Sequence, residues 1–575
     1  MLKDRMLFLS TLMGGIILGL FFLTTKVLIS YKHPLTTIPE YETIKILYWI
    51  GFILLILPIA LKCNKKIKIA TLVIIILFTT LNYALISPYG RTYGRDSIYN
   101  LQNTENLIEN KYWEKGEGTG YAKAYSYFPS LAILNATISL ITNIDLDITF
   151  FYFHSILRAI LIPLLLYLIF KPFVKKEYMI LAILLYFTSP SLKTHIHQEG
   201  IGIIFILLTL YLLINAEKNY INIILAAIIS LLTFFSHHFS SYVLIGWIIF
   251  LSIGLFIRYL IKEDTINALK YIIFMLFIII SLLFIPTAIN RNLAIHTLEL
   301  VNITNWLDFS NINSLSDNYI GIDLSPFDIS MVLISSLIIL IAIIIGLIYK
   351  KQNMVLTISF LYCGLITIFS TTFIPTEGLY IFLRIFEFAY IGFIPLIVIG
   401  LEKIEKHKYL NYLLPFLLVI IFIGGNVLID GGQARYLFTD KDLLTNDNFI
   451  HETPAIFIAS EFMKDKNGGI IGDKLIYNII GGYQNKKVYI DKDNQLRNAF
   501  GPSEKIKYQD LNYLASQDIY FIIPNIYQDK TINTYSEDIS FYKLENSLYL
   551  QKIYSNQDIQ IYQIRYQELE CCLPY

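Results

Sequence analysis

Long apolar segments separated by short polar turns make up the chain as far as residue 429. A helix that crosses a bilayer needs about 20 predominantly apolar residues. Such a segment must be helical, because lipid offers no partner to its backbone N–H and C=O groups. The pattern predicts thirteen spans, at residues 6–30, 46–61, 69–86, 147–170, 177–190, 200–215, 221–235, 240–260, 269–288, 329–349, 354–374, 379–401 and 409–429.

The apolar segment 128–141 is short for a span, and the positive charges decide how we interpret it. Lysine and arginine collect on the cytoplasmic side of membrane proteins. Lysines cluster at 62–68 and again at 171–176, and both clusters are cytoplasmic only if 128–141 lies on the outer surface as an interfacial helix. The N-terminus is then cytoplasmic, and the loops 88–129, 189–199 and 290–328 are extracytoplasmic.

After residue 429 the apolar runs shorten to strand length and polar stretches separate them. Residues 469–473, 487–491, 519–524 and 559–564 read as strands, and 454–464 and 474–482 as helices. We therefore expect a polytopic α-helical transmembrane domain over 1–429 and a small extracytoplasmic α/β domain over 430–575.

Composition agrees with a multi-pass protein of the plasma membrane. Hydrophobic residues make up 55% of the 575-residue chain and charged residues 15%, and the mean hydropathy is +0.57. A net charge of +1 shows no basic excess. Nucleic acid is therefore not an expected partner.

The loop 88–129 is the longest and most polar interruption among the early spans. It carries Arg95 and Asp96, and from Ser97 to Asn110 it can form an amphipathic helix. A carboxylate close to the membrane surface is costly unless a site uses it. The alternative is an ordinary outer loop.

Charged residues also occur within the predicted spans. Arg384 and Glu387 are three residues apart, on one helical face, and Arg158 follows His154 by four residues. Intramembrane charges face a bundle interior or a cavity, and arginine suits a lipid phosphate through its planar fork. The alternative is a structural ion pair between spans.

Histidines gather near two outer span ends. His195, His197 and Glu199 alternate by two, so an extended loop would point them the same way, and His237 and His238 end another span. His195, His197 and Glu199 form a conceivable ligand set for a divalent cation, although no His-Glu-x-x-His motif supports it. Interfacial histidines bonded to the backbone are the alternative, and no cofactor is required by the sequence.

The layout resembles the GT-C superfamily of integral-membrane glycosyltransferases, and is nearest to its uncharacterised archaeal members. The residues that carry this resemblance are Arg95-Asp96 with the helix that follows, Tyr112-Trp113, Tyr125-Ser126-Tyr127-Phe128-Pro129, Glu199 and Ser236-His237-His238. The chain departs from the family in having three spans before the first large outer loop. It also lacks a Trp-Trp-Asp motif, so whole-glycan transfer to asparagine is not implied.

The resemblance implies transfer of a sugar from a polyprenyl-phosphate-linked donor to a glycan, lipid or protein acceptor at the outer face of the bilayer. It places a catalytic base at Asp96 and a second acidic position at Glu199. Because the departing phosphate needs cationic stabilisation, we expect Arg384, Arg158, His237, His238 and Arg95 to contact it. A polytopic transporter, a lipid-linked glycan flippase and a surface-polysaccharide polymerase are the alternatives.

Overall fold

A computed structural model of the chain describes most of the helical part and the core of a C-terminal sheet. The described residues are 2–31, 40–61, 63–86, 95–113, 128–187, 198–216, 219–262, 269–278, 280, 326–350, 354–371, 374–407, 412–422, 454–466, 468–472, 519–524, 531–533, 538–540, 550–555 and 559–564.

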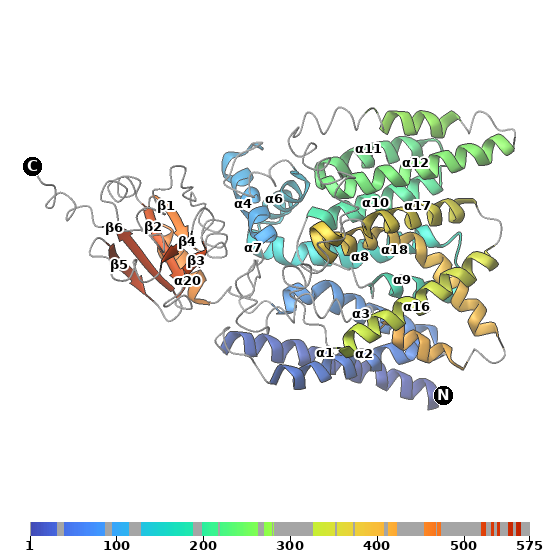
Figure 1. Cartoon of the computed structure of the whole chain (residues 1–575), viewed down its shortest axis with the longest axis horizontal. Helices are drawn as coiled ribbons and strands as arrows, with labels where there is room; N and C mark the ends of the chain where they lie inside the picture. Colours follow the sequence, from blue (N-terminus) through green and yellow to red (C-terminus); the bar gives the residue numbers. More distant parts are fainter. Residues whose placement is uncertain are drawn as a thin grey trace, which may run out of the picture.

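The described helices form a bundle with a smaller group of helices at one end (Figure 1). They are α1 (Leu2–Tyr31), α2 (Glu40–Ala60), α3 (Lys65–Ile86), α4 (Arg95–Asn110), α6 (Ser130–Thr142), α7 (Leu146–Ile148), the π-helix η1 (Thr149–Phe153), α8 (His154–Phe170), the 3-10 helix η2 (Lys176–Tyr178), α9 (Met179–Phe187), α10 (Gln198–Ile214), α11 (Ile221–Ser236), α12 (His238–Ile261), α16 (Pro326–Tyr349), α17 (Met354–Thr371), α18 (Ile374–Lys406) and α20 (Pro454–Met463).

Each of the thirteen predicted spans overlaps a helical stretch, so the periodicity located the helices correctly. Four helical stretches are long and apolar enough to cross a bilayer, and seven shorter apolar ones accompany them in the part of the chain that is described. The protein is therefore a helical membrane protein with many apolar helices. The count of thirteen crossings and their direction stay predictions.

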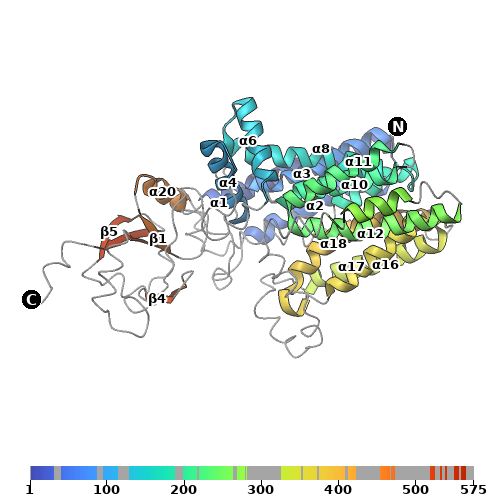
Figure 2. The same ribbon diagram turned by 90° about the horizontal axis from the view of Figure 1, so that it is seen from above.

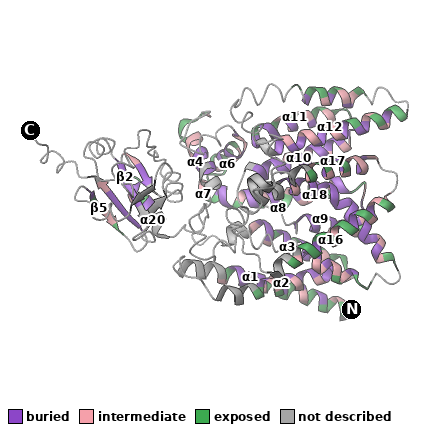
Figure 3. Cartoon of the chain, viewed as in Figure 1, coloured by how far each residue is buried: buried purple, intermediate pink, exposed green. Residues whose placement is uncertain are grey.

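The surface of the bundle is suited to lipid. Large apolar side chains point outward from the peripheral helices, for example Phe8 at 55% and Leu164 at 51% exposure. Exposed residues occupy the outward faces of these helices, and buried residues face the interior (Figure 3). In water such a surface would aggregate, whereas in a bilayer hydrocarbon chains cover it.

Glycines let several helices approach closely. A side chain at Gly14 of α1 would meet the backbone oxygen of Gly51 on α2 at 2.7 Å. Between α16 and α18, Gly346 lies against the Leu396 carbonyl and Gly400 against that of Ala342. Small residues at such crossings are typical of helix packing in lipid, where close van der Waals contact replaces the hydrophobic effect.

Helix α18 is the centre of the bundle. It is 33 residues long, or about 50 Å, and 89% of its apolar window is buried. Lys175 and Lys406 both form ion pairs with Glu402, and the hydroxyl of Tyr178 donates to Glu405 Oε2 at 2.6 Å. These bonds fix the last turns of α18 to the segment between α8 and α9.

A helical cap lies at the end of the bundle where α10 begins (Figures 1 and 2). It consists of α4, α6, α7 and η1. Leu101 of α4 packs in one small apolar cluster with Leu131 of α6, Phe150 of η1 and Ile201 of α10. The helix predicted over 97–110 is confirmed as α4, which begins two residues earlier. The segment 128–141 is confirmed as helical, and its placement on the membrane surface stays a prediction.

The C-terminal part contains a mixed sheet, as the alternating pattern predicts. Strands β1 (Gly469–Gly472), β2 (Ile519–Pro524), β5 (Leu550–Ser555) and β6 (Ile559–Ile564) lie in the order β1-β2-β6-β5, and β3 (Thr531–Asn533) pairs with β4 (Asp538–Ser540). The β1–β2 pair is parallel, whereas β2–β6 and β5–β6 are antiparallel.

Helix α20 covers the sheet through a core of its own. Ala459 and Met463 of α20 are buried together with Ile470, Ile522 and Ile561 of the strands. Three of the four predicted strands and the helix predicted over 454–464 are therefore confirmed. The predicted strand 487–491 and helix 474–482, together with a domain boundary at 430, lie outside the described residues.

Candidate functional site

The beginning of α8 carries a buried arginine for which the described residues provide no counter-ion. Arg158 lies on the second turn of α8 and is 4% exposed. Its Nε is buried and has no hydrogen-bond partner, and among the described residues no salt bridge joins its guanidinium to a carboxylate. Because an uncompensated buried charge is strongly unfavourable, this guanidinium is suited to an anionic ligand.

Two further polar side chains share the face of α8 that carries Arg158. His154 and Ser155 lie one turn earlier, each 1% exposed. They follow directly on the five-residue π-helix η1. Such π-turns widen a helix locally and occur frequently at functional sites. The departure from α-helical geometry thus lies next to the polar face of α8.

The first turn of α10 lies against this face because it contains glycine. A side chain at Gly200 would meet His154 Nε2 at 2.7 Å and Arg158 Cδ at 3.2 Å, and one at Gly202 would meet Ser240 Oγ of α12 at 2.5 Å. Glu199, the residue before Gly200, is 1% exposed. The glycines therefore let the beginning of α10 lie close to both α8 and α12, and Glu199 is buried in the same turn.

The junction of α11 and α12 contributes a histidine with a defined role. His237 caps α12: its Nδ1 accepts from the backbone N–H of Ser240 at 3.3 Å and lies 3.1 Å from the hydroxyl of the same residue. In the neutral ring, a nitrogen that accepts from a backbone N–H has no hydrogen of its own, so Nε2 carries the hydrogen. The ring lies 6.5 Å from that of Phe128, centroid to centroid, at the start of the α6 region. His237 is thus a hydrogen-bond donor next to the cap.

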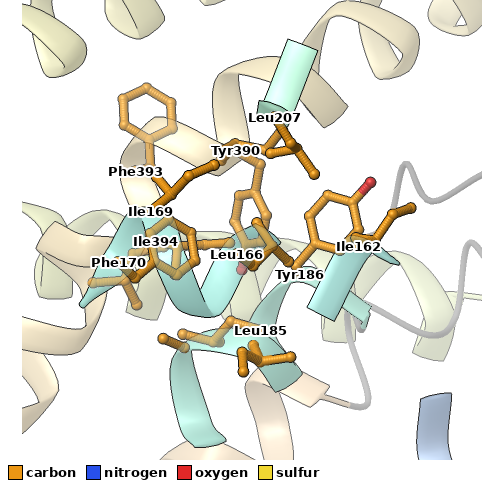
Figure 4. Packing of buried hydrophobic residues seen from close by; sticks show 14 of the residues in the cluster. Ile162, Leu166, Ile169, Phe170, Leu185, Tyr186, Leu207, Tyr390, Phe393 and Ile394 are labelled. Carbon is orange, nitrogen blue, oxygen red and sulfur yellow. The ribbon is translucent and has the colours of Figure 1, made fainter. Parts of the chain in front are cut away.

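A second carboxylate lies deeper, on α18. Glu387 is fully buried, and its Oε1 accepts from the hydroxyl of Tyr186 on α9 at 3.1 Å. Arg158, Glu199 and Glu387 all lie near enough to the Tyr186 hydroxyl to act on it electrostatically. Figure 4 shows Tyr186 among apolar side chains of α8, α10 and α18. Polar groups of four helices are therefore gathered in an apolar surrounding.

The cap that carries Asp96 has an acidic surface next to its apolar cluster. Burial raises the pKa of Glu105 on α4 to about 7, and the nearby Asp147, Glu109 and Asp145 raise it in the same direction. Glu105 therefore changes charge near neutral pH. This change occurs on the helix whose first turn contains Asp96.

The structure brings together some of the residues predicted from sequence. Arg158, Glu199 and His237 belong to helices that pack on one another, and Glu387 joins them through Tyr186. The backbones of Arg95, Asp96, His238 and Arg384 lie in α4, α12 and α18, while their side chains are outside the described residues. His195 and His197 are outside them as well. Within the described part no group of three or more histidine, cysteine or acidic residues is suited to a metal, so the cation site of His195, His197 and Glu199 stays a prediction.

Sequence reasoning missed Tyr186, Ser155 and the two glycines. Tyr186 lies in an apolar run, where its ring looks like core and only its hydroxyl is distinctive. The Glu199-Gly200-Ile201-Gly202 sequence did carry a signal. Two glycines in the first turn of an apolar helix are unfavourable for the helix, and that points to close packing at the site.

No protein-family profile matches the chain, and no curated protein matches its sequence. Among solved structures, the chain is similar to ArnT from Cupriavidus metallidurans bound to undecaprenyl phosphate. The TM-score is 0.39 with 8% identity, over 87% of this chain and 97% of that one. We draw no conclusion about fold or activity from a similarity of this size.

Proposed function

We propose that the protein is a membrane glycosyltransferase that moves a sugar from a polyprenyl-phosphate-linked donor to an acceptor hydroxyl. The site is the end of the bundle where α8, α10 and α12 meet beneath the cap. The observation that carries the proposal is Arg158, a buried guanidinium with neither hydrogen bond nor ion pair among the described residues, packed against the first turn of α10.

The unpaired guanidinium favours a phosphate ligand. Arginine binds phosphate through two parallel N–H bonds, which a surrounding of low dielectric strengthens. His237 supplies a further donor at the start of α12. A donor with a lipid tail stays in the bilayer, so its phosphate meets the protein at the end of a helix bundle.

The reaction needs one bond exchange and one proton transfer. The bond from the sugar's anomeric carbon to the phosphate oxygen breaks, and its electron pair stays on the polyprenyl phosphate. A bond forms from the acceptor oxygen to the same carbon, and the acceptor's proton passes to a carboxylate. Asp96 is our assignment for this base and Glu199 is the rival.

Arg158 stabilises the negative charge that grows on the departing phosphate. Arg384, three residues before Glu387 on α18, is assigned the same role. The lipid bilayer and a glycan, lipid or protein acceptor are the partners, with the cap and residues 430–575 outside the plasma membrane. The proposal includes a divalent cation bound by His195, His197 and Glu199. Loss of activity on chelator treatment, and its recovery on addition of metal, would test this cation site.

Arg158→Lys tests the phosphate contact. The lysine keeps the charge but loses the bidentate geometry, so we expect donor binding to weaken about tenfold, which corresponds to 1.4 kcal/mol. Binding of a labelled polyprenyl-phosphate sugar and release of that sugar to acceptor would be measured on the full chain in nanodiscs. Arg258→Lys, at the other end of α12, is the matched control and leaves both unchanged.

Two results would count against the proposal. Unaltered donor affinity in a folded Arg158→Lys protein would remove the phosphate from this site. Donor binding with movement of the lipid across the membrane, and no sugar transfer, would favour a flippase instead.

A further inference from the structure

A buried hydroxyl that bonds to no described residue lies one turn before Arg158. Ser155, on the first turn of α8, is 1% exposed, and its Oγ has no hydrogen-bond partner within the described part of the chain. A buried polar group that is left unbonded costs free energy, because the bond to water that it gives up on folding is not replaced. Folded proteins retain few such groups, so the Ser155 hydroxyl requires a physical reason.

Other buried hydroxyls of the bundle bond to their own helix. Serine and threonine within a helix commonly donate to the carbonyl oxygen of the residue four positions earlier. Thr79, Thr80, Ser230 and Ser241 all form this bond, at 2.6–2.8 Å. Ser155 does not follow this pattern.

The π-helix η1 is a physical reason for the difference. The carbonyl four positions before Ser155 belongs to Phe151, which lies inside η1. A carbonyl in a π-turn bonds to the N–H five positions later instead of four, so the turn is wider than in an α-helix. The carbonyl to which Ser155 would otherwise donate is therefore displaced, and the hydroxyl keeps its hydrogen for another acceptor.

Ser155 and Arg158 lie on the same side of α8. They are three positions apart, about 60° around the helix and about 4.5 Å along its axis. A long side chain on a helix points back over the turn that precedes it. The Arg158 side chain does so, since a Cβ at Gly200 would lie 3.2 Å from Arg158 Cδ and 2.7 Å from Nε2 of His154, one turn earlier. The guanidinium therefore extends over the turn that carries Ser155.

Charge distinguishes Ser155 from the two other buried hydroxyls that lack a partner in the described part, Thr209 on α10 and Ser252 on α12. Neither of these has a charged residue within four positions on its own helix. Beside Ser155, in contrast, the buried Nε of Arg158 also has no hydrogen-bond partner among the described residues. A hydroxyl donor next to a guanidinium donor suits an anion that offers several acceptor oxygens.

A phosphate group is an anion of this kind. We propose that the Ser155 hydroxyl donates a hydrogen bond to an oxygen of the same phosphate that Arg158 binds. This inference rests on the proposed function, in which the phosphate belongs to a polyprenyl-phosphate-linked sugar. The bond strengthens as negative charge grows on the departing phosphate. Ser155 is thus a donor-binding residue and not the base of the reaction.

Ser155→Ala removes the hydroxyl oxygen and little else. We expect the full-length variant in nanodiscs to bind polyprenyl phosphate about tenfold to a hundredfold more weakly than the wild type, because a hydrogen bond to a charged group is lost. Binding of the corresponding polyprenol, which has no phosphate, should be unchanged. Thermal stability without added lipid should equal or exceed that of the wild type, because the buried hydroxyl removed forms no bond to the described residues.

Ser252→Ala is the matched control. Ser252 is also 1% exposed and also lacks a partner among the described residues. It lies twelve positions after Ser240, the residue next to Gly202, or about 18 Å further along α12. The control should have the same effect on thermal stability as Ser155→Ala, with wild-type affinity for both lipids.

The outcomes separate this inference from the proposed function. Wild-type affinity of Ser155→Ala for polyprenyl phosphate, together with weakened binding by Arg158→Lys, would overturn the role of Ser155 and leave the proposed function standing. Wild-type affinity of both variants would remove the phosphate from this site and overturn both. Equal weakening for polyprenyl phosphate and polyprenol, with a lower melting temperature, would show that Ser155 is structural and would also overturn the inference.

Discussion

Gly200→Ala is the sharpest test of the site, because it adds a single methyl group between the residues that define it. The new carbon would lie 2.7 Å from His154 Nε2, 2.9 Å from His154 Cε1 and 3.2 Å from Arg158 Cδ. Both neighbours are almost completely buried, so neither can swing into open space. The methyl group must displace His154, Arg158 or α10 itself.

The expected magnitude follows from two opposing effects. Overpacking a dense interior costs about 1–3 kcal/mol, whereas alanine in place of glycine favours a helix by about 0.8–1 kcal/mol. The net destabilisation is therefore small, about 0–2 kcal/mol. Activity responds more steeply, because a shift of about 1 Å in a positioned group lowers the rate by up to about a hundredfold.

The assay compares thermal stability, donor affinity and sugar transfer for Gly200→Ala and a control. Gly364→Ala on α17 is the matched control, since nothing lies within 4 Å of the position that its new carbon would take. We expect Gly364→Ala to behave as the wild type, and Gly200→Ala to fold with at least tenfold weaker transfer. Full transfer by a folded Gly200→Ala protein would refute the close packing of α10 on α8 as the basis of the site.

The remaining predictions concern charge and topology. When α4 is docked, the pKa of Glu105 is about 7 instead of its ordinary value of 4.5. The docking of α4 should therefore weaken as the pH rises from about 4.5 to 7. Hydrogen exchange in α4 should become faster over this range, and Glu105→Gln should abolish this pH dependence. Asp96→Asn should lower the transfer rate about a hundredfold or more with donor affinity retained, and a dead Glu199→Gln beside a normal Asp96→Asn would reassign the base. Arg384→Lys should weaken donor binding, whereas loss of expression would indicate a structural ion pair. A cysteine placed near Asn448 should react with an impermeant reagent in intact cells, and reaction only after permeabilisation would invert the predicted topology.

The sequence predicted where the helices and strands lie better than it predicted which of them pack together. Hydropathy located the apolar helices, and alternation located β1, β2 and β6, because both patterns report which faces of a local element are buried. The strands β3, β4 and β5 were missed. β3 and β4 are three residues long, and the burial of β5 alternates poorly, with a bulge between Lys552 and Tyr554. The π-helix η1 was missed too, since no residue type encodes it.

The candidate site residues show the same difference between local pattern and packing. Charges within apolar spans are visible in the sequence, so Arg158, Glu199 and Glu387 were singled out from it. Tyr186 was not, because its role depends on a contact with Glu387 across 201 residues of chain. Partners so distant in sequence leave no local pattern, and the packing of α9 against α18 alone brings them together.

The beginning of α10 shows how close helix packing can bury charged groups inside an apolar bundle. At the beginning of α10, Gly200 and Gly202 occupy positions where a larger residue would favour the helix. A first turn tolerates this because its N–H groups lack intrahelical partners in any case. The close approach leaves Glu199 and Arg158 buried, and among the described residues no salt bridge joins the two side chains. Under the proposed function, an arginine paired with a neighbouring carboxylate would have to exchange that partner for a phosphate. Arg158, which forms no ion pair among the described residues, would bind the donor's phosphate without this penalty.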